Sequence, residues 1–163
     1  MRIVMGVEKM NATIRTAVPK DEGRIRELFL EMLRTIYHTA DVKGYDAGYL
    51  DKYWSGGKDR IYVAEDHDEV IAFLSIEVHH EPEDYVYIDD FSVAEGYRNK
   101  GIGSELIGIA EAYAKEIGTG AVLLHVEKTN ESATRLYERL GYSIYRDDGH
   151  RFLLKHDIVS SLT

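Results

Sequence analysis

The sequence predicts an α/β fold with one mixed sheet, in which an antiparallel meander is followed by strand, helix, strand, helix and strand. Strand-like runs separated by short turns fill the middle of the chain, and helical and strand patterns alternate from residue 104 onward. The length of 163 residues corresponds to one domain over residues 1–163, whose first residues, 1–11, form a ragged N-terminal extension.

Composition and charge exclude several classes of protein. With 44% hydrophobic and 30% charged residues, the chain belongs among folded proteins. The absence of cysteine excludes thiolate nucleophiles, iron–sulfur clusters and cysteine-ligated zinc, and fits a reducing compartment. A formal net charge of −9 opposes binding to nucleic acid. Because no apolar stretch is long enough to span a membrane and the charged start Met1–Lys9 is no signal peptide, we expect a cytoplasmic protein without membrane contact.

The first elements are a short strand and an amphipathic helix. The pattern over residues 12–18 predicts the strand, and Pro19–Glu22 predicts the start of the helix. Apolar side chains then recur at helical spacing at Ile25, Leu28, Phe29, Met32, Leu33 and Ile36. Glycines divide residues 37–58 into a loop, a short helix and a second loop.

A meander and a strand–helix alternation follow. Residues 60–65 and 70–79 form a hairpin around the polar turn 66–69, and residues 84–93 extend it by a third strand. The remaining elements are a helix over 104–117, a strand over 121–126, a helix over 131–140, a strand over 142–146 and a strand over 151–156.

The third strand of the meander breaks the alternation of apolar residues. Ile88 occupies an even position, whereas Phe91 and Val93 occupy odd positions, so a regular strand cannot turn all three to one face. One extra residue near Asp89-Asp90, a β-bulge, restores the register. Because bulges splay strands and leave backbone groups unpaired, we expect a gap there into which a ligand inserts.

The turn before the helix at residue 104 has the composition of an anion site. In Val93–Leu106, glycines permit close approach of the backbone, and the start of a helix carries partial positive charge. The basic residues Arg98 and Lys100 agree with a phosphate ligand, although such charges are also common on a solvated surface. An ordinary strand-to-helix turn also uses glycine, so the pair Gly101 and Gly103 alone leaves both interpretations open.

Two phosphate ligands are disfavoured by the residues around these glycines. Gly96 and Gly101 have the spacing of a nucleoside triphosphate loop, but Ile102 stands where that loop needs lysine. Gly101 and Gly103 match the start of a dinucleotide fingerprint, but Leu106 occupies its third glycine position.

Two sequence blocks resemble the GNAT superfamily of N-acetyltransferases. The pattern R-x-x-G-x-G, at Arg98, Gly101 and Gly103, follows the bulged strand as it does in that family. A second block over Leu124–Tyr142 is similar to the family signature N-x-x-A-x-x-x-Y-x-x-x-G-[FY]. With the N-terminal strand and helix, the resemblance covers residues 12–156 and implies a GNAT-type fold with a splayed, bulged central strand.

The resemblance implies that acetyl-CoA, or another acyl-CoA, is the co-substrate. The backbone N–H groups expected to bind its pyrophosphate are those of Arg98, Asn99, Lys100, Gly101, Ile102, Gly103 and Ser104. The residues expected along its pantetheine arm are Phe91, Ser92, Val93, Asn130, Ala133 and Tyr137. Asn130 is also a favourable cap for the helix over 131–140, and both roles are compatible.

The implied reaction is direct attack of an amine, which needs a base and an acid. Tyr137 matches the family tyrosine that donates a proton to the CoA sulfur, the alternative being a core tyrosine. Tyr87 and His125 resemble residues that order a catalytic water in some protein N-terminal acetyltransferases, although a histidine in a strand is often structural. Asp89 and Asp90 either bind a cationic amine or raise one another's pKa, and the alternative is that they only form the bulge.

The acceptor is expected to be a small cationic amine or the amino group of a peptide or protein. Glu77 is a further candidate for binding it. In similar proteins, part of the acceptor wall comes from the segment that here contains Tyr37, His38, Tyr45, Tyr49, Tyr53 and Trp54. We expect no metal, since neighbouring His79 and His80 point to opposite faces of a strand.

Three further expectations concern partners and alternatives. Many relatives in this family are dimers, so a homodimer is possible. A non-catalytic acyl-CoA-binding sensor would keep the cofactor cleft but turn over no amine. A nucleotide-binding protein is the third interpretation, which Ile102 opposes.

Overall fold

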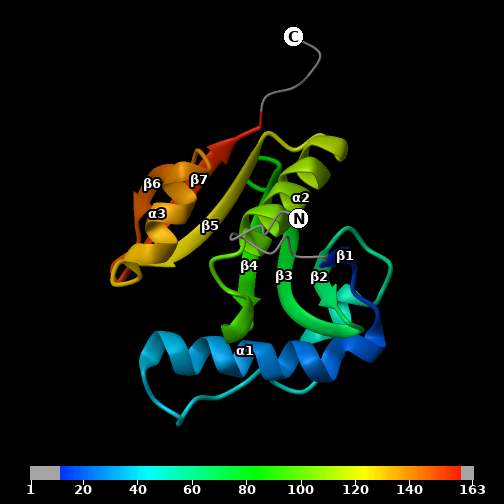
Figure 1. The fold of residues 1–163 in the computed structure, drawn as a ribbon. Coiled ribbons are helices and arrows are strands. Elements are labelled where there is room, and N and C mark those ends of the chain that lie inside the picture. Colours follow the sequence, from blue (N-terminus) through cyan, green and yellow to red (C-terminus); the bar gives the residue numbers. More distant parts are fainter. Residues whose placement is uncertain (1–11, 159–163) are drawn as a thin grey trace, which may run out of the picture.

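The structure is a computed structural model that describes residues 12–158. Within these residues, one mixed sheet of seven strands has the order β1-β2-β3-β4-β5-β7-β6 (Figure 1). The strands are β1 (Thr13–Thr16), β2 (Arg60–Asp66), β3 (Glu69–His79), β4 (Tyr85–Val93), β5 (Ala121–Glu127), β6 (Ser143–Asp147) and β7 (Arg151–Asp157). The helices are α1 (Glu22–Tyr37), α2 (Ile102–Glu116) and α3 (Glu131–Arg139), with short 3-10 turns η1 (Pro19–Asp21), η2 (Tyr49–Tyr53) and η3 (Glu95–Tyr97).

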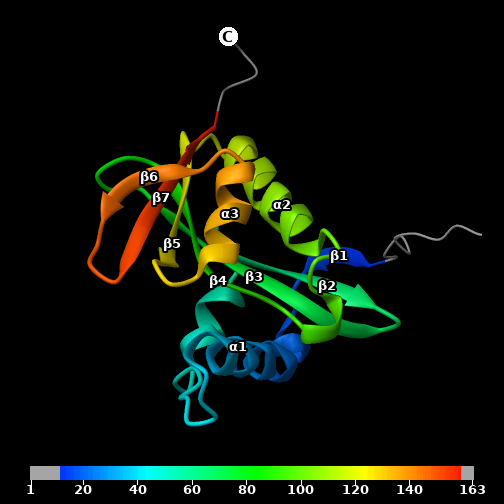
Figure 2. The same ribbon diagram turned by 60° about the vertical axis from the view of Figure 1, so that its left-hand side comes forward.

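Helices α1 and α2 cover opposite faces of the sheet (Figure 2). The adjacent residues Phe91 and Ser92 of β4 show this directly, because neighbouring side chains of a strand point to opposite faces. The Ser92 hydroxyl donates to the carbonyl of Leu28 in α1 over 2.9 Å. The ring of Phe91 lies against Gly103 at the start of α2. The main hydrophobic core therefore has one part beneath each helix.

The predicted bulge in β4 is confirmed. In the β3–β4 ladder, Ser75 pairs with Asp90 and the next residue, Ile76, pairs with Ile88, so that Asp89 is the extra residue. Ile88 is buried in the main core, and Phe91 and Val93 pack against the same core. The bulge thus lets all three apolar side chains pack against the core, as the alternation argument requires.

Strands β4 and β5 part after a short parallel ladder. Among the described residues, this ladder comprises the pairs Val86–Val122, Tyr87–Leu123 and Ile88–Leu124. Both strands continue, β4 to Val93 and β5 to Glu127, but the structure records no pairing between these later halves. The splayed central strand predicted from the sequence is therefore present.

The predicted elements agree with the structure apart from details of their ends. Helix α2 begins at Ile102, two residues before the predicted start, so part of the predicted phosphate-binding turn is the first turn of a helix. The final strand β7 lies between β5 and β6 and is antiparallel to both. The predicted extension over residues 1–11 lies outside the described residues. Within residues 12–158 no helix is long and apolar enough to cross a membrane.

Candidate active site at the split between β4 and β5

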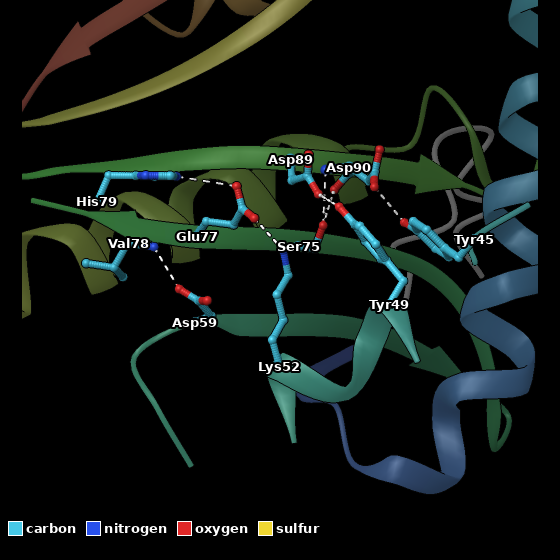
Figure 3. Close-up of polar contacts among 10 residues, drawn as sticks. All are labelled: Tyr45, Tyr49, Lys52, Asp59, Ser75, Glu77, Val78, His79, Asp89 and Asp90. Atoms are coloured by element: carbon cyan, nitrogen blue, oxygen red, sulfur yellow. Dashed lines mark hydrogen bonds and ion pairs between the residues drawn. The ribbon is translucent and has the colours of Figure 1, made fainter. Parts of the chain in front are cut away.

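The bulge brings two adjacent carboxylates to the α1 face of β4, close to the split. In a regular strand Asp89 and Asp90 would point to opposite faces, but here both meet tyrosines from the segment after α1 (Figure 3). The Tyr45 hydroxyl donates to Asp90 Oδ2 over 2.6 Å, and the Tyr49 hydroxyl donates to Asp89 Oδ2 over 2.7 Å. The tyrosine rings stack on each other, with centroids 4.8 Å apart.

This arrangement makes the two carboxylates weaker acids than usual. Burial, followed by the neighbouring Asp89 charge, raises the pKa of Asp90 to about 7. Burial also raises the pKa of Asp89, although its hydrogen bond from Tyr49 acts in the opposite direction. Burial and the Asp90 charge hold the pKa of Tyr45 well above its usual range, so Tyr45 remains a hydrogen-bond donor.

A lysine and a glutamate extend this acidic cluster along β3. Lys52 of η2 forms an ion pair with Glu77, and its ammonium lies 4.8 Å from the centre of the Tyr49 ring (Figure 3). Burial raises the pKa of Glu77, but the Lys52 ion pair and the contact with His79 outweigh it and lower the pKa. Glu77 is therefore ionised and already has a cationic partner, whereas Asp89 and Asp90 are bonded only to neutral tyrosines among the side-chain contacts described.

Tyr87 and His125 lie in direct contact on the α1 face of the sheet. The Tyr87 oxygen is 2.5 Å from His125 Nδ1, so the two side chains share a hydrogen bond without an intervening water. The other ring nitrogen, Nε2, is 2.8 Å from Asp148 Oδ2 in the turn between β6 and β7. Burial raises the pKa of Tyr87 to about 12, which keeps its hydroxyl protonated at neutral pH.

The turn between β4 and α2 presents backbone donors at a helix start. Asn99 and Gly101 have positive φ angles of 61° and 88°, which reverse the chain ahead of the helix. The first helical hydrogen bond runs from Glu105 N–H to the Gly101 carbonyl over 3.1 Å, so the intervening N–H groups have no acceptor within the helix. Such donors, with the helix dipole behind them, are suited to a phosphate group.

Two of the predicted cofactor residues in this region, Arg98 and Ile102, have side chains that stabilise the fold. Arg98 donates to the Val93 carbonyl over 2.9 Å and lies 3.4 Å from Glu31 of α1, so its guanidinium fastens the turn to β4 and α1. The Ile102 side chain is buried in the core. Lys100 is exposed, and Ser104 is half-buried in the first turn of α2.

The second predicted block places Asn130, Ala133 and Tyr137 on α3. Asn130 caps the helix, because its side-chain oxygen accepts from Ala133 N–H over 3.3 Å. Tyr137, one turn further on, is 7% exposed, and burial raises its pKa to about 12. Burial therefore keeps the phenol protonated at neutral pH, so its O–H group is available as a donor.

Tyr37, the last predicted acceptor residue, is the final residue of α1. Its side chain is 56% exposed, and its hydroxyl reaches Glu127 Oε1 at the end of β5 over 3.5 Å. This weak contact joins α1 to the far side of the split. Within residues 12–158 no cluster of three or more histidine and acidic side chains has the arrangement of a metal site, and a reaction without metal stays a prediction.

Sequence reasoning missed Lys52 and Asp148. Lys52 lies in η2 three residues after Tyr49, and this spacing was the available signal that these two side chains share a face. Asp148 belongs to the turn Asp147-Asp148-Gly149, whose composition indicates a turn but gives no sign that one carboxylate contacts a strand residue.

Comparison with protein families gives a match over most of the chain. The profile described as the Acetyltransferase (GNAT) family matches residues 24–142. Mycothiol acetyltransferase of Corynebacterium efficiens is 27% identical over 139 residues, which cover 82% of this chain and 46% of that protein. The chain thus spans about half the length of this curated relative.

Two solved structures illustrate the shared fold. PaiA N-acetyltransferase from Thermoplasma acidophilum, in complex with coenzyme A, has a TM-score of 0.75 at 18% identity and covers 91% of this chain and 99% of its own. Arabidopsis thaliana NAA60, in complex with a bisubstrate analogue, has a TM-score of 0.69 at 24% identity and covers 93% of this chain and 100% of its own. At these identities the likeness establishes the fold.

Proposed function

The chain belongs to the Acetyltransferase (GNAT) family, and from this membership we propose that it transfers the acetyl group of acetyl-CoA to a cationic primary amine. The observation that carries the proposal is the parting of β4 from β5 after Ile88, beside the free N–H groups at the start of α2. We take the whole chain as one acetyltransferase domain. The homodimer and the cytoplasmic location remain predictions.

The donor site combines the α2 N-terminus with the unpaired half of β4. The N–H groups of residues 102–104 supply donors for the pyrophosphate, as anions favour helix N-termini. Beyond Ile88, strand β4 has an edge without a β5 partner, and Phe91, Ser92 and Val93 offer backbone groups there to the amide-containing pantetheine arm. When bound, acetyl-CoA supplies the activated thioester carbonyl.

The acceptor site lies on the α1 face, where Asp89 and Asp90 hold the ammonium form of the amine. Their ionised oxygens attract a cation, and the bound cation in turn favours the ionised form of Asp90. Glu77 contributes less, because Lys52 already neutralises it. We propose a small cationic amine or a peptide amino group, with Tyr37 at the outer edge of the site.

The reaction requires a base for the acceptor ammonium and an acid for the departing sulfur. An alkyl ammonium has a pKa near 10.4, so it must lose a proton before its nitrogen attacks. We assign this step to Tyr87 and His125, which lie on the same face of the sheet as Asp89. When the nitrogen bonds to the acetyl carbon and the carbon–sulfur bond breaks, the Tyr137 hydroxyl gives its proton to the departing sulfur. The nitrogen then loses its second proton to solvent, and solvent returns a proton to the Tyr137 oxygen.

The donor assignment is tested by thermal unfolding with acetyl-CoA, coenzyme A or ATP, followed by a coenzyme A release assay on cationic amines. A ligand at ~100 times its dissociation constant should stabilise the fold by ~2.7 kcal/mol. We expect stabilisation by acetyl-CoA but not by ATP, and release of coenzyme A with at least one amine. No stabilisation by acetyl-CoA would overturn the donor assignment, and binding without any turnover would favour the sensor.

Tyr137→Phe tests the assigned acid. Because general acid catalysis contributes ~10²–10⁴-fold, we expect kcat to fall about 100-fold while acetyl-CoA binding, measured by calorimetry, stays within about twofold. Tyr142→Phe is the matched control, since it removes a hydroxyl from the buried ring 6.0 Å away. Equal kcat values for the two variants would show that Tyr137 is only a core residue.

A further inference from the structure

We propose that Asp148, in the turn between β6 and β7, is a positioning residue that holds His125 in the tautomer able to accept a proton through Tyr87. This inference rests on the proposed function, because it concerns the step that deprotonates the acceptor amine. It adds to the pair Tyr87 and His125 a third residue, which the sequence indicated only as part of a turn.

The hydrogen bonds fix which nitrogen of His125 carries the proton. A carboxylate can only accept, so the 2.8 Å contact with Asp148 Oδ2 requires the proton of the neutral ring to reside on Nε2. The Nδ1 lone pair then faces Tyr87, whose hydroxyl must donate across the 2.5 Å contact. The His125 side chain is 15% exposed, which limits its freedom to adopt another orientation.

Asp148 is itself held in place and kept ionised. Arg146 of β6 binds it through two contacts, Nε to Oδ1 over 2.6 Å and Nη2 to Oδ2 over 3.0 Å. Arg146 first, and then His125, hold the pKa of the Asp148 carboxyl well below its usual range. Its negative charge is therefore present across the whole neutral range, so its oxygen remains an acceptor for His125 Nε2–H.

The three residues form a path for one proton. The ammonium gives a proton to the Tyr87 oxygen while the Tyr87 hydroxyl proton moves to His125 Nδ1. The amine is then neutral, Tyr87 is unchanged, and His125 is an imidazolium with one N–H on Tyr87 and the other on Asp148. No charge is created or lost in the transfer, and the imidazolium later releases its proton to solvent.

Other charged or titratable groups surround this path and set its electrostatic background. Arg151 of β7 lowers the pKa of Tyr87, whereas the carboxylates of β3 and β4 raise it. The ring of His79 on β3 meets Tyr87 edge-on at 6.3 Å. The groups facing the path, besides its own three members, are Glu77, His79, Asp89, Asp90, Arg146 and Arg151.

Asp148→Asn and Asp147→Asn, compared across pH 5–10, test the proposal. Asp147 is the matched control, because it lies in the same turn but pairs with Lys128 over 2.7 Å and not with His125. We expect Asp148→Asn to lower kcat about 10- to 100-fold and to move the acidic limb of kcat/KM down by about one pH unit, as the imidazolium loses an anionic partner. We expect Asp147→Asn to retain the wild-type profile.

If Asp148→Asn lowers the plateau of kcat/KM but leaves the acidic limb of its pH profile in place, Asp148 has a structural role and the proposal is overturned. Equal pH profiles for Asp148→Asn and Asp147→Asn would also overturn it. Thermal unfolding of both variants identifies any general loss of folding. The change from Asp to Asn keeps an acceptor for Nε2–H, so Asp148→Ala is added for the measurement of the tautomer.

Nitrogen NMR of His125 at pH 8 tests the tautomer without any turnover. We expect the Nε2–H form in the wild type and a mixture with the Nδ1–H form in Asp148→Ala. A predominant Nδ1–H form in the wild type would overturn the inference. If no amine is acetylated, the proposed function fails while this spectrum still decides the tautomer; if turnover is present but insensitive to Asp148, only the inference fails.

Discussion

Asp90 shows how one extra residue in a strand changes the chemistry of a side chain. The bulge places its carboxylate beneath Tyr45 and beside Asp89, on the face that α1 covers. Tyr45 donates a hydrogen bond to Asp90, which lowers the pKa of Asp90. Burial and the adjacent Asp89 charge outweigh this effect and raise the pKa of Asp90 to about 7. Ionisation of Asp90 is therefore unfavourable in the folded protein. A cationic acceptor bound beside it would favour the ionised carboxylate.

Asp90→Asn should stabilise the folded protein in alkaline solution. Between pH 4 and 7 the folded protein holds a proton on Asp90 that the unfolded chain has lost, so the free energy of unfolding decreases as the pH rises through this range. Asparagine has no charge to bury and still accepts from Tyr45. We expect a gain of about 1–3 kcal/mol at pH 8 and little change at pH 4, measured by urea unfolding at both pH values. A gain of the same size at pH 4 would show that its origin is not the ionisation of Asp90.

Individual site residues differed in how far the sequence could locate them. Tyr87 and His125 were predicted because each lies in a recognisable block, and the β4–β5 ladder brings them together. Asp148 is separated from His125 by 23 positions. The two residues meet because β7 pairs with β5 in a register that places Arg151 opposite Glu127. That register is a tertiary property, and the local turn composition contains no information about it.

At the scale of elements, the first turn of α2 is fitted closely to β4. A methyl group at Gly103 would lie 2.7 Å from the Phe91 ring, whereas Gly108, on the exposed side of the same helix, has open space around its Cα. Glycine at residue 103 thus lets the helix start lie directly against the unpaired half of β4. The predicted phosphate donors and the predicted pantetheine strand are held together by this contact.

Gly103→Ala and Gly108→Ala should therefore have different effects. Gly108→Ala is expected to stabilise the protein by about 0.5–1 kcal/mol, because alanine is the better helix former. Gly103→Ala must displace Phe91, so we expect it to lose that gain and to weaken acetyl-CoA binding about 10-fold, measured by calorimetry. Similar stability and affinity in the two variants would contradict the close fit between α2 and β4.

Most elements could be predicted because their patterns are local. The bulge was predicted from the break in the alternation of Ile88, Phe91 and Val93. The glycine-containing turn predicted the start of α2 to within two residues. The placement of β7 between β5 and β6 could not be derived in the same way, because strand order depends on pairings between distant residues.

For the molecule as a whole, the net charge of −9 should act on the acceptor through long-range attraction. Salt shortens the range of this attraction, to about 8 Å at 0.15 M ionic strength. With saturating acetyl-CoA, we expect kcat/KM for a cationic amine to fall about threefold or more between 20 and 300 mM NaCl. An amine that is uncharged at the assay pH serves as the control and should change little. Equal salt dependence for both would mean that the acceptor is not steered by charge.

The short ladder between β4 and β5 also has a mechanical consequence. A continuous sheet resists bending because each strand is hydrogen-bonded to its neighbours along its length. Here strands β1–β4 form one block and strands β5, β7 and β6 form another. The ladder described between the two blocks has three residue pairs. We therefore expect the angle between these blocks to change more easily than the geometry within either block. A donor molecule that binds in the split, as proposed above, would contact both blocks, and we expect it to make the protein stiffer.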